Sequence, residues 1–219
     1  MPKPVANPPP IPPPPAGFWW RTLACLADIL PLMFLASALV GLLAGQSEKA
    51  AQQRAESFVN RISEQYIKVS TSGNLREVEK LSAMVKKLEE KDNLDRKALI
   101  SWYAFQANVS FVTMLIGLSL QEWLLGGRTL GKRIFNLRTV SLPDTHPPGF
   151  LSAVARSCIK AVFITLPIFH FENSLVLNIY LILIMLLGIV NFHVPLFRRD
   201  KRAWHDLWTR TQVVDNKLP

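Results

Sequence analysis

A single carboxylate stands inside the first long apolar stretch of the sequence and is the residue with the most obvious chemistry. Asp28 lies ten residues after Phe18 in the apolar run 18–44, so a helix would carry it about 15 Å into a bilayer. A carboxylate at that depth costs several kcal/mol unless it is protonated or paired. Asp28 therefore predicts either a polar link between helices or a site for an ion or proton, and both interpretations stay open.

Asp28 needs a partner from elsewhere in the chain. Arg21 lies seven residues earlier, roughly 10 Å away along the helix axis. It is too distant for direct contact within one helix, and it can instead reach the lipid head groups. The candidate partners are basic or amide side chains on two other apolar segments. They are Arg156 and Lys160 on 150–171, and Gln106 and Asn108 on 98–125.

The segment from Gly126 to Lys132 has the G-x-x-x-x-G-K spacing of a phosphate-binding loop. That loop needs a strand before it and a hydroxyl side chain after its lysine, whereas here an apolar span precedes it and Arg133 follows. We therefore reject nucleotide binding. The loop 126–149 interleaves basic and apolar residues, which suits a segment lying on an anionic membrane surface. These residues are Arg128, Lys132, Arg133, Ile134, Phe135, Leu137, Arg138 and Val140.

Catalytic and metal-ligating patterns are absent from the sequence. His205 and Asp206 are adjacent, and neighbours in a helix point in different directions. The four histidines show no metal-ligand spacing, and Cys25 and Cys158 lie in apolar helices, where a packed small residue is expected. Since no nucleophile elbow or acid pair appears either, we expect no enzyme activity, no metal site and no cofactor.

The charged residues are distributed very unevenly. Of 41 acidic and basic residues, 11 basic and 9 acidic ones fall in 46–97, which leaves the rest of the chain strongly apolar. About 20 apolar residues suffice to cross a bilayer. The fold class predicted is therefore all-α, an integral membrane bundle of about four helical segments. They are 18–44, 98–125, 150–171 and 174–197, with full crossing by 150–171 left open because it contains Arg156 and Lys160.

Charge near the ends of the spans predicts the topology. The loop 126–149 and the tail from 198 are both basic, and such segments favour the cytoplasmic side. Both termini are then cytoplasmic in a multi-pass protein of the cell (inner) membrane, and 46–97 faces outward. The net charge of +9 thus predicts contact with anionic lipids at the cytoplasmic face and not nucleic-acid binding.

The charged segment 46–97 reads as an extra-membrane helical hairpin. Apolar residues recur three and four positions apart in each half, with a turn at Gly73-Asn74 between the halves. Its stripes would suit a protein partner. They comprise Phe58, Ile62 and Tyr66, then Leu75, Val78, Leu81, Val85 and Leu88. Outside the membrane region, a Pro-rich tail over 1–16 is expected to be a disordered spacer, and 215–219 form a short C-terminal tail.

Three segments in order resemble the RDD family of multi-pass membrane proteins. The first is Gly17-Phe-Trp-Trp-Arg21-Thr-Leu-Ala24-Cys-Leu-Ala-Asp28, and the second is Gly127-Arg-Thr129-Leu-Gly131-Lys132. The third runs from Arg198 through His205-Asp206 to a Thr-x-Val-Val ending at 211–214. The resemblance covers a membrane domain over 17–214, into which 46–97 looks inserted.

The resemblance implies roles for particular residues. Arg21, Asp28 and Asp206 would be the residues that give the family its name, and Gly127, Thr129, Gly131 and Lys132 would form its loop motif. Arg21 and Asp206 are expected at the cytoplasmic boundary, close enough to pair. Family members have been linked to transport, including sodium–proton exchange.

Two functions follow as hypotheses. One is a transport or transport-accessory role in which Asp28 titrates or binds a cation. The other is a membrane scaffold or assembly factor that binds a protein partner through the 46–97 hairpin, with Arg21, Asp28 and Asp206 holding the fold.

Overall fold

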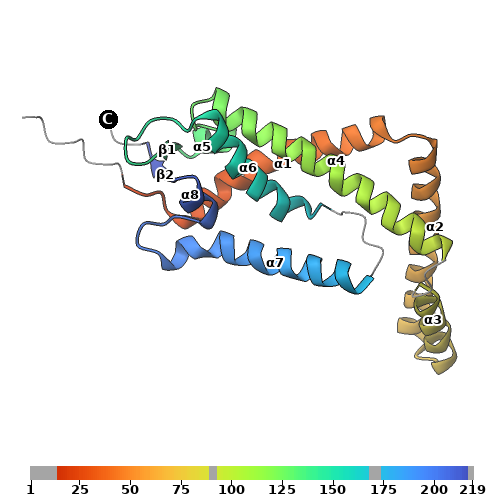
Figure 1. Ribbon diagram of the computed structural model, residues 1–219. Helices are drawn as coiled ribbons and strands as arrows, with labels where there is room; N and C mark the ends of the chain where they lie inside the picture. The colour runs from red at the N-terminus through yellow and green to blue at the C-terminus, as the bar shows by residue number, and fades with distance from the viewer. Residues whose placement is uncertain (1–13, 89–92, 168–173, 217–219) are drawn as a thin grey trace, which may run out of the picture.

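The computed structural model describes residues 14–88, 93–167 and 174–216 and is mostly helical (Figure 1). The long apolar helices lie roughly alongside one another, the charged helices run across one end of them, and the shortest helices and the strands gather at the other end. The elements in chain order are α1 (Phe18–Leu43), α2 (Gln46–Ser72), α3 (Leu75–Leu88), α4 (Leu94–Leu124), α5 (Leu130–Ile134), β1 (Leu137–Ser141), α6 (Phe150–Thr165), α7 (Ser174–Phe197), α8 (Trp204–Trp208) and β2 (Thr211–Asp215).

Three of the described helices are long and apolar enough to cross a membrane, namely α1, α4 and α7. They correspond to three of the four predicted spans. The fourth prediction, 150–171, forms the helix α6 over 16 residues, which is about 24 Å of helix against a hydrocarbon core of about 30 Å. Leu166 ends α6 in the left-handed conformation, and 168–173 lie outside the described residues.

Helix α4 is the centre of the bundle and packs against α1, α2 and α6. Close approach to α1 depends on Gly117, because a Cβ there would overlap the side chain of Leu32. The adjoining apolar core consists of Leu32, Met114, Leu118 and Ala161. Sequence periodicity fixes these contacts, because the small and apolar residues of each helix recur on one face.

Helices α2 and α3 occupy the charged segment and meet at the predicted turn. Gly73 adopts the left-handed conformation that ends α2, and the Asn74 side chain accepts a hydrogen bond from the Arg76 amide. The predicted stripe on α2 is only partly correct: Phe58 is buried in the described structure, whereas Tyr66 is 62% exposed. The buried residue is instead Gln65, one position earlier. Its side-chain amide donates a hydrogen bond to the Glu77 carboxylate of α3.

A two-stranded antiparallel sheet joins distant parts of the chain, and an all-α fold class did not predict it. β1 pairs with β2 so that Thr139 lies opposite Val213. The side chains of Leu137 and Val140 are buried there, so these two apolar residues of the 126–149 segment pack inside the protein. Pro14–Ala16 also pair with β2, so the last residues of the predicted disordered tail are ordered, while 1–13 lie outside the described residues.

Candidate functional site

Asp28 holds the short helix α5 against α1. Its carboxylate accepts a hydrogen bond from the Thr129 hydroxyl at 2.5 Å and another from the Gly131 amide at 2.7 Å. Gly131 sits so close to α1 that a Cβ on it would overlap the carbonyl oxygen of Ala24. The loop motif and the first span are therefore two halves of one contact. Thr129 supplies a hydroxyl hydrogen-bond donor. Gly131 supplies an amide donor and, because it has no side chain, allows α5 to approach α1 closely.

The predicted partners of Asp28 contact other residues. Arg156 is fully buried and forms an ion pair with Asp206 at 2.9 Å, and Lys160 lies 3.8 Å from a carboxylate oxygen of Glu122. The prediction that these cations neutralise Asp28 was wrong, because the loop after α4 folds back onto α1 and supplies its own donors. Asn108 is an exposed residue of α4.

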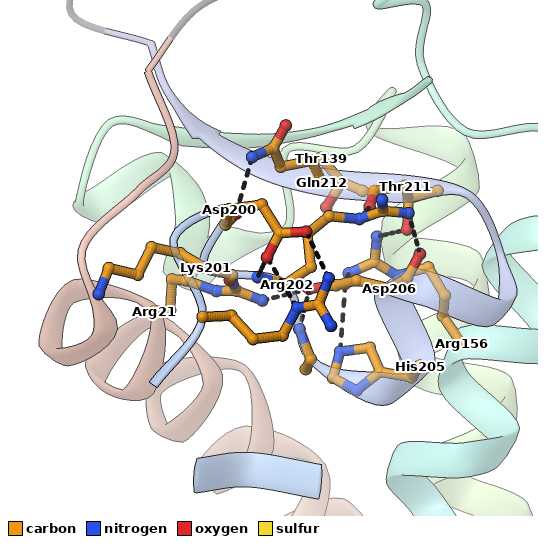
Figure 2. Close-up of polar contacts among 12 residues, drawn as sticks. Arg21, Thr139, Arg156, Asp200, Lys201, Arg202, His205, Asp206, Thr211 and Gln212 are labelled. Atoms are coloured by element: carbon orange, nitrogen blue, oxygen red, sulfur yellow. Dashed lines mark hydrogen bonds and ion pairs between the residues drawn. The ribbon is translucent and has the colours of Figure 1, made fainter. Parts of the chain in front are cut away.

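Asp206 is the meeting point of three segments (Figure 2). One carboxylate oxygen pairs with the Arg21 guanidinium and also accepts a hydrogen bond from the Ala203 amide at 3.1 Å. The other oxygen pairs with Arg156. Arg21 additionally donates to the carbonyl oxygen of Lys201. The predicted pairing of Arg21 with Asp206 is confirmed, and it ties α1 and α6 to the C-terminal segment.

The His205 ring lies close to the Asp206 carboxylate, although neighbouring side chains in a helix were expected to point in different directions. Its Nε2 lies 3.4 Å from the Asp206 carboxylate, and its backbone amide donates to the Asn191 side chain on α7 at 3.2 Å. Burial by itself would raise the pKa of Asp206, but His205, Arg156 and Arg21 bring that pKa well below its usual range. Asp206 is therefore ionised at neutral pH and acts as a fixed anion.

Glu122 is the central residue that sequence reasoning missed. It is 1% exposed, near the end of α4, and its carboxylate lies 2.9 Å from Lys132 and 3.6 Å from Arg156. An acidic residue at the end of an apolar span ordinarily reads as an interfacial group. The sequence did contain a signal for Glu122. The segments after α4 have more basic than acidic residues, and any of these cations that is buried needs an anionic partner.

Lys132 completes the connection between the loop and the sheet. Its ammonium donates to Glu122 at 2.9 Å and to the Thr139 hydroxyl of β1 at 2.6 Å. Burial lowers its pKa from 10.5 to about 8, although Glu122 opposes this shift. Lys132 is thus held in place by one residue of α4 and one of β1.

Gly127 allows the loop to turn back from α4 toward the sheet. It has a φ of +78° and accepts a hydrogen bond from the Thr139 amide at 2.9 Å. Its own amide donates to the Glu122 carbonyl at 2.7 Å. A side chain at Gly127 would be strained and would meet the Thr139 carbonyl.

A cavity of about 550 Å³ lies beside this charged cluster. We call it the cationic pocket, because four basic side chains and two carboxylates line it. The charged residues of its wall are Arg21, Lys132, Arg156 and Lys160, with Asp28 and Glu122. The wall itself has two positive charges in excess, and Asp206, which pairs with Arg21 and Arg156 from outside the wall, reduces this excess to one. The rest of the wall is mainly apolar and comes mostly from α1 and α7, with single residues of α4, α6 and the two strands.

Metal-binding geometry is not found in the part of the chain that the structure describes, where no three His, Cys, Asp or Glu side chains cluster. Cys25 and Cys158 are free thiols, each half-buried. The cationic pocket instead offers hydrogen-bond donors and positive charge to a ligand, and these suit an anion.

The chain was compared with known protein families, curated proteins and solved structures. The family model described as the RDD family matches residues 15–210. No curated protein and no solved structure matches the chain. The match spans α1, the loop motif and the Asp206 segment, which are the parts brought together around the cationic pocket.

Proposed function

The chain belongs to the RDD family of membrane proteins, and we propose that it serves a transport or transport-accessory function by binding an anionic group in the cationic pocket. The observation that carries this proposal is the charge of the pocket wall. Four basic side chains line it against two carboxylates, and Asp206 pairs with two of these cations from outside the wall, so one positive charge remains in excess and favours an anion over a cation.

Asp28 is a poor cation site in this arrangement. Both of its carboxylate oxygens accept hydrogen bonds, from Thr129 and from the Gly131 amide. A cation at Asp28 would compete with these two donors and would approach a wall with an excess of positive charge. We therefore assign Asp28 to holding α5 on α1, and we move the binding role predicted for it to the basic residues of the pocket.

Lys160 is the cation available to a ligand. Its nearest acid is Glu122 at 3.8 Å, beyond hydrogen-bond distance, and its ammonium makes no hydrogen bond with the described residues. Lys132 bonds one carboxylate oxygen of Glu122, and Lys160 lies nearest the other oxygen without hydrogen-bonding it. An ionisable residue within a membrane domain whose hydrogen-bond donors are not taken up points to function. An anion entering the pocket gains charge-assisted hydrogen bonds from Lys160.

The experiment uses full-length protein in neutral detergent and measures thermal unfolding. Inorganic phosphate or phosphatidylglycerol should raise the unfolding temperature, because a ligand that binds the folded state stabilises it. Sodium chloride at equal ionic strength controls for screening. Lys160→Met should abolish the rise, whereas Lys68→Met, an exposed lysine on α2, should keep it. Absence of any rise with both anions in the wild type would remove the proposal.

The membrane placement proposed is a multi-pass one, with four helical segments and both termini on the cytoplasmic side of the cell (inner) membrane. The basic loop after α4 and the basic tail after α7 support it, since positive residues near spans favour that side. The α2–α3 pair then lies outside. Cysteines placed at Ser72 and Arg199, with Cys25 and Cys158 replaced by Ala, test this in intact cells. An impermeant thiol reagent should label position 72 alone, and the reverse labelling would contradict it.

A second candidate function, a scaffold that binds a protein partner, is favoured by one face of α3. Leu75 is 78% exposed, Val78 43% and Val85 47%, which is a row of apolar side chains without cover in this structure. A full deletion is a poor test, because Ala55 of α2 packs in one core cluster with Trp102 of α4. The double substitution of Leu75 and Val78 by Glu leaves that cluster intact. It should remove a co-purifying partner, and unchanged recovery would count against the scaffold.

A further inference from the structure

We infer that the anion bound in the cationic pocket is the phosphate head group of an anionic membrane lipid, whose acyl chains leave the pocket between α1 and α7. This inference rests on the proposed anion-binding function and adds the class of ligand and its route of entry.

The wall of the pocket is divided by polarity. Its charged side chains are joined by an apolar surface, so a small hydrophilic anion would leave that surface uncovered and dewetted. An amphiphile covers both parts, with its head group at Lys160 and its first methylenes against the apolar wall. The apolar lining includes Leu26 and Ile29 of α1, Leu118 of α4, Ile164 of α6, and Phe192 of α7.

The pocket lies between two helices that make little direct contact with each other. Helix α1 packs mainly on α4 and α5, and α7 packs on α6 and α8. Figure 1 shows α7 on the outer side of the bundle, next to α6. Both α1 and α7 are apolar enough to span a membrane. Their separation therefore opens the pocket sideways, toward the hydrocarbon of a bilayer.

Side chains near this opening are suited to lipid. Leu26, on the pocket wall, is 49% exposed, and Ile189, one turn from Phe192 on α7, is 54% exposed. Trp19 also lines the pocket and is 72% exposed, as amphipathic aromatics are at the head-group level of membranes. A lipid can thus reach Lys160 without its chains leaving an apolar environment.

The volume agrees with a head group and not with a whole lipid. About 550 Å³ falls in the range of ligand pockets, roughly 300–1,000 Å³. Basic pockets between membrane helices on the cytoplasmic side are also where anionic head groups bind in other proteins. The basic loop and tail beside this pocket raise the local concentration of anionic lipid, since each basic residue near the surface adds attraction.

Native mass spectrometry of the full chain tests the inference. The protein is mixed in neutral detergent with palmitoyl-oleoyl phosphatidylglycerol or with phosphatidylcholine carrying the same chains. The wild type should retain phosphatidylglycerol in preference to phosphatidylcholine. Lys160→Met should weaken that retention about tenfold to a hundredfold, the loss expected for one hydrogen bond to a charged group.

Two matched variants on α1 test the lateral route. Leu26→Trp adds bulk at the pocket opening, and Leu30→Trp adds the same bulk at a position that is 57% exposed and outside the pocket lining. Leu26→Trp should lose lipid retention while keeping stabilisation by inorganic phosphate, and Leu30→Trp should behave as the wild type. The unfolding temperature of each variant checks that it is folded. We expect both to fold, because both positions are partly exposed.

The outcomes separate the two proposals. If phosphate stabilises the wild type through Lys160 but phosphatidylglycerol is not preferred, the anion site stands and the lipid inference is overturned. Equal retention by Leu26→Trp and Leu30→Trp likewise overturns the route between α1 and α7. If neither phosphate nor lipid binds in a Lys160-dependent manner, both proposals fall.

Discussion

Two aspartates of this protein each contact two arginines, yet they stand in opposite environments. Asp206 pairs with Arg21 and Arg156, and its side chain is 0% exposed. Asp95, at the start of α4, pairs with Arg61 at 3.1 Å and lies 3.8 Å from Arg54, and its side chain is 28% exposed. The chemical groups are the same, and the difference is burial.

This difference teaches where charge determines the fold. An exposed ion pair contributes little, because water and salt screen it and its side chains lose entropy when they pair. A buried pair contributes little net stability either, but removing one member leaves an uncompensated charge in a medium of low dielectric. The charged cluster around Asp206 and Glu122 therefore enforces one arrangement of the helices, whereas the charges of α2 and α3, although more numerous, do not.

The largest effect is expected from Asp206→Asn. Arg156 is fully buried. The substitution removes its ion pair with Asp206 and leaves Glu122, at 3.6 Å, as its nearest acid. Unpairing a buried ion costs about 3–5 kcal/mol, and we expect a loss of that size in the free energy of unfolding. Denaturant unfolding in detergent measures it. A loss below about 1 kcal/mol, typical of surface pairs, would erase the contrast with Asp95.

A side chain at Gly131 should also destabilise the cluster, by preventing α5 from docking on α1. The Cβ of Gly131→Ala would overlap the Ala24 carbonyl oxygen, and such overpacking typically costs about 1–3 kcal/mol. Gly41→Ala, in α1, is the matched control, since a Cβ there meets nothing within 4 Å. It should be neutral or stabilising by up to about 1 kcal/mol. Gly131→Ala should lower the unfolding temperature and Gly41→Ala should leave it unchanged or raise it, and equal shifts would contradict the packing described.

Asp28→Asn tests whether this carboxylate is architectural. An amide can accept only one of the two hydrogen bonds that Thr129 and Gly131 donate, so about 1–3 kcal/mol should be lost. The folded fraction should still bind anions, because the basic residues of the cationic pocket are unchanged. Stability unaffected by the change would show that α5 does not depend on Asp28.

The pH dependence of anion binding should follow Lys132. Burial lowers its pKa to about 8, with Glu122 opposing the shift, so Lys132 is protonated below that pH and loses its charge above it. The pocket wall then carries one positive charge less, and anion affinity should fall several-fold between about pH 7 and pH 9. Lys132→Arg, which keeps its charge throughout this range, should flatten the profile. A wild-type affinity that is constant over this range would exclude the role of Lys132.

The smallest effect is expected from Asp95→Asn. It breaks exposed pairs with Arg54 and Arg61, and double-mutant cycles of such pairs give about 0.2–1 kcal/mol. High salt should reduce even this difference, because exposed charges are screened. A salt-independent loss approaching that of Asp206→Asn would mean that burial is not what separates the two aspartates.

The sequence was sufficient for the parts of the fold that depend on local pattern. Apolar runs located α1, α4 and α7, and Gly73-Asn74 located the turn between α2 and α3. The pairing of Arg21 with Asp206 was also predicted, because both residues were expected at the cytoplasmic boundary. In each case the information lies within one segment or in an ordered set of motifs.

The contacts that complete the site depend on long-range packing and were not predictable in this way. The loop after α4 folds back onto α1, so Asp28 meets Thr129 and Gly131 and not the cations of α6. Glu122 reads as interfacial until Lys132 and Arg156 are known to converge on it. The strands β1 and β2 are five residues each, far apart in the chain, and neither pattern indicates its partner.

The most direct test of the account measures stability and anion binding on the same samples of Asp28→Asn and Lys160→Met. We predict that Asp28→Asn lowers the unfolding temperature and keeps anion binding per folded molecule. Lys160→Met should keep the unfolding temperature and lose binding. The opposite pattern, with binding lost in Asp28→Asn at unchanged stability and retained in Lys160→Met, would contradict the assignment of Asp28 to the fold and of Lys160 to the ligand.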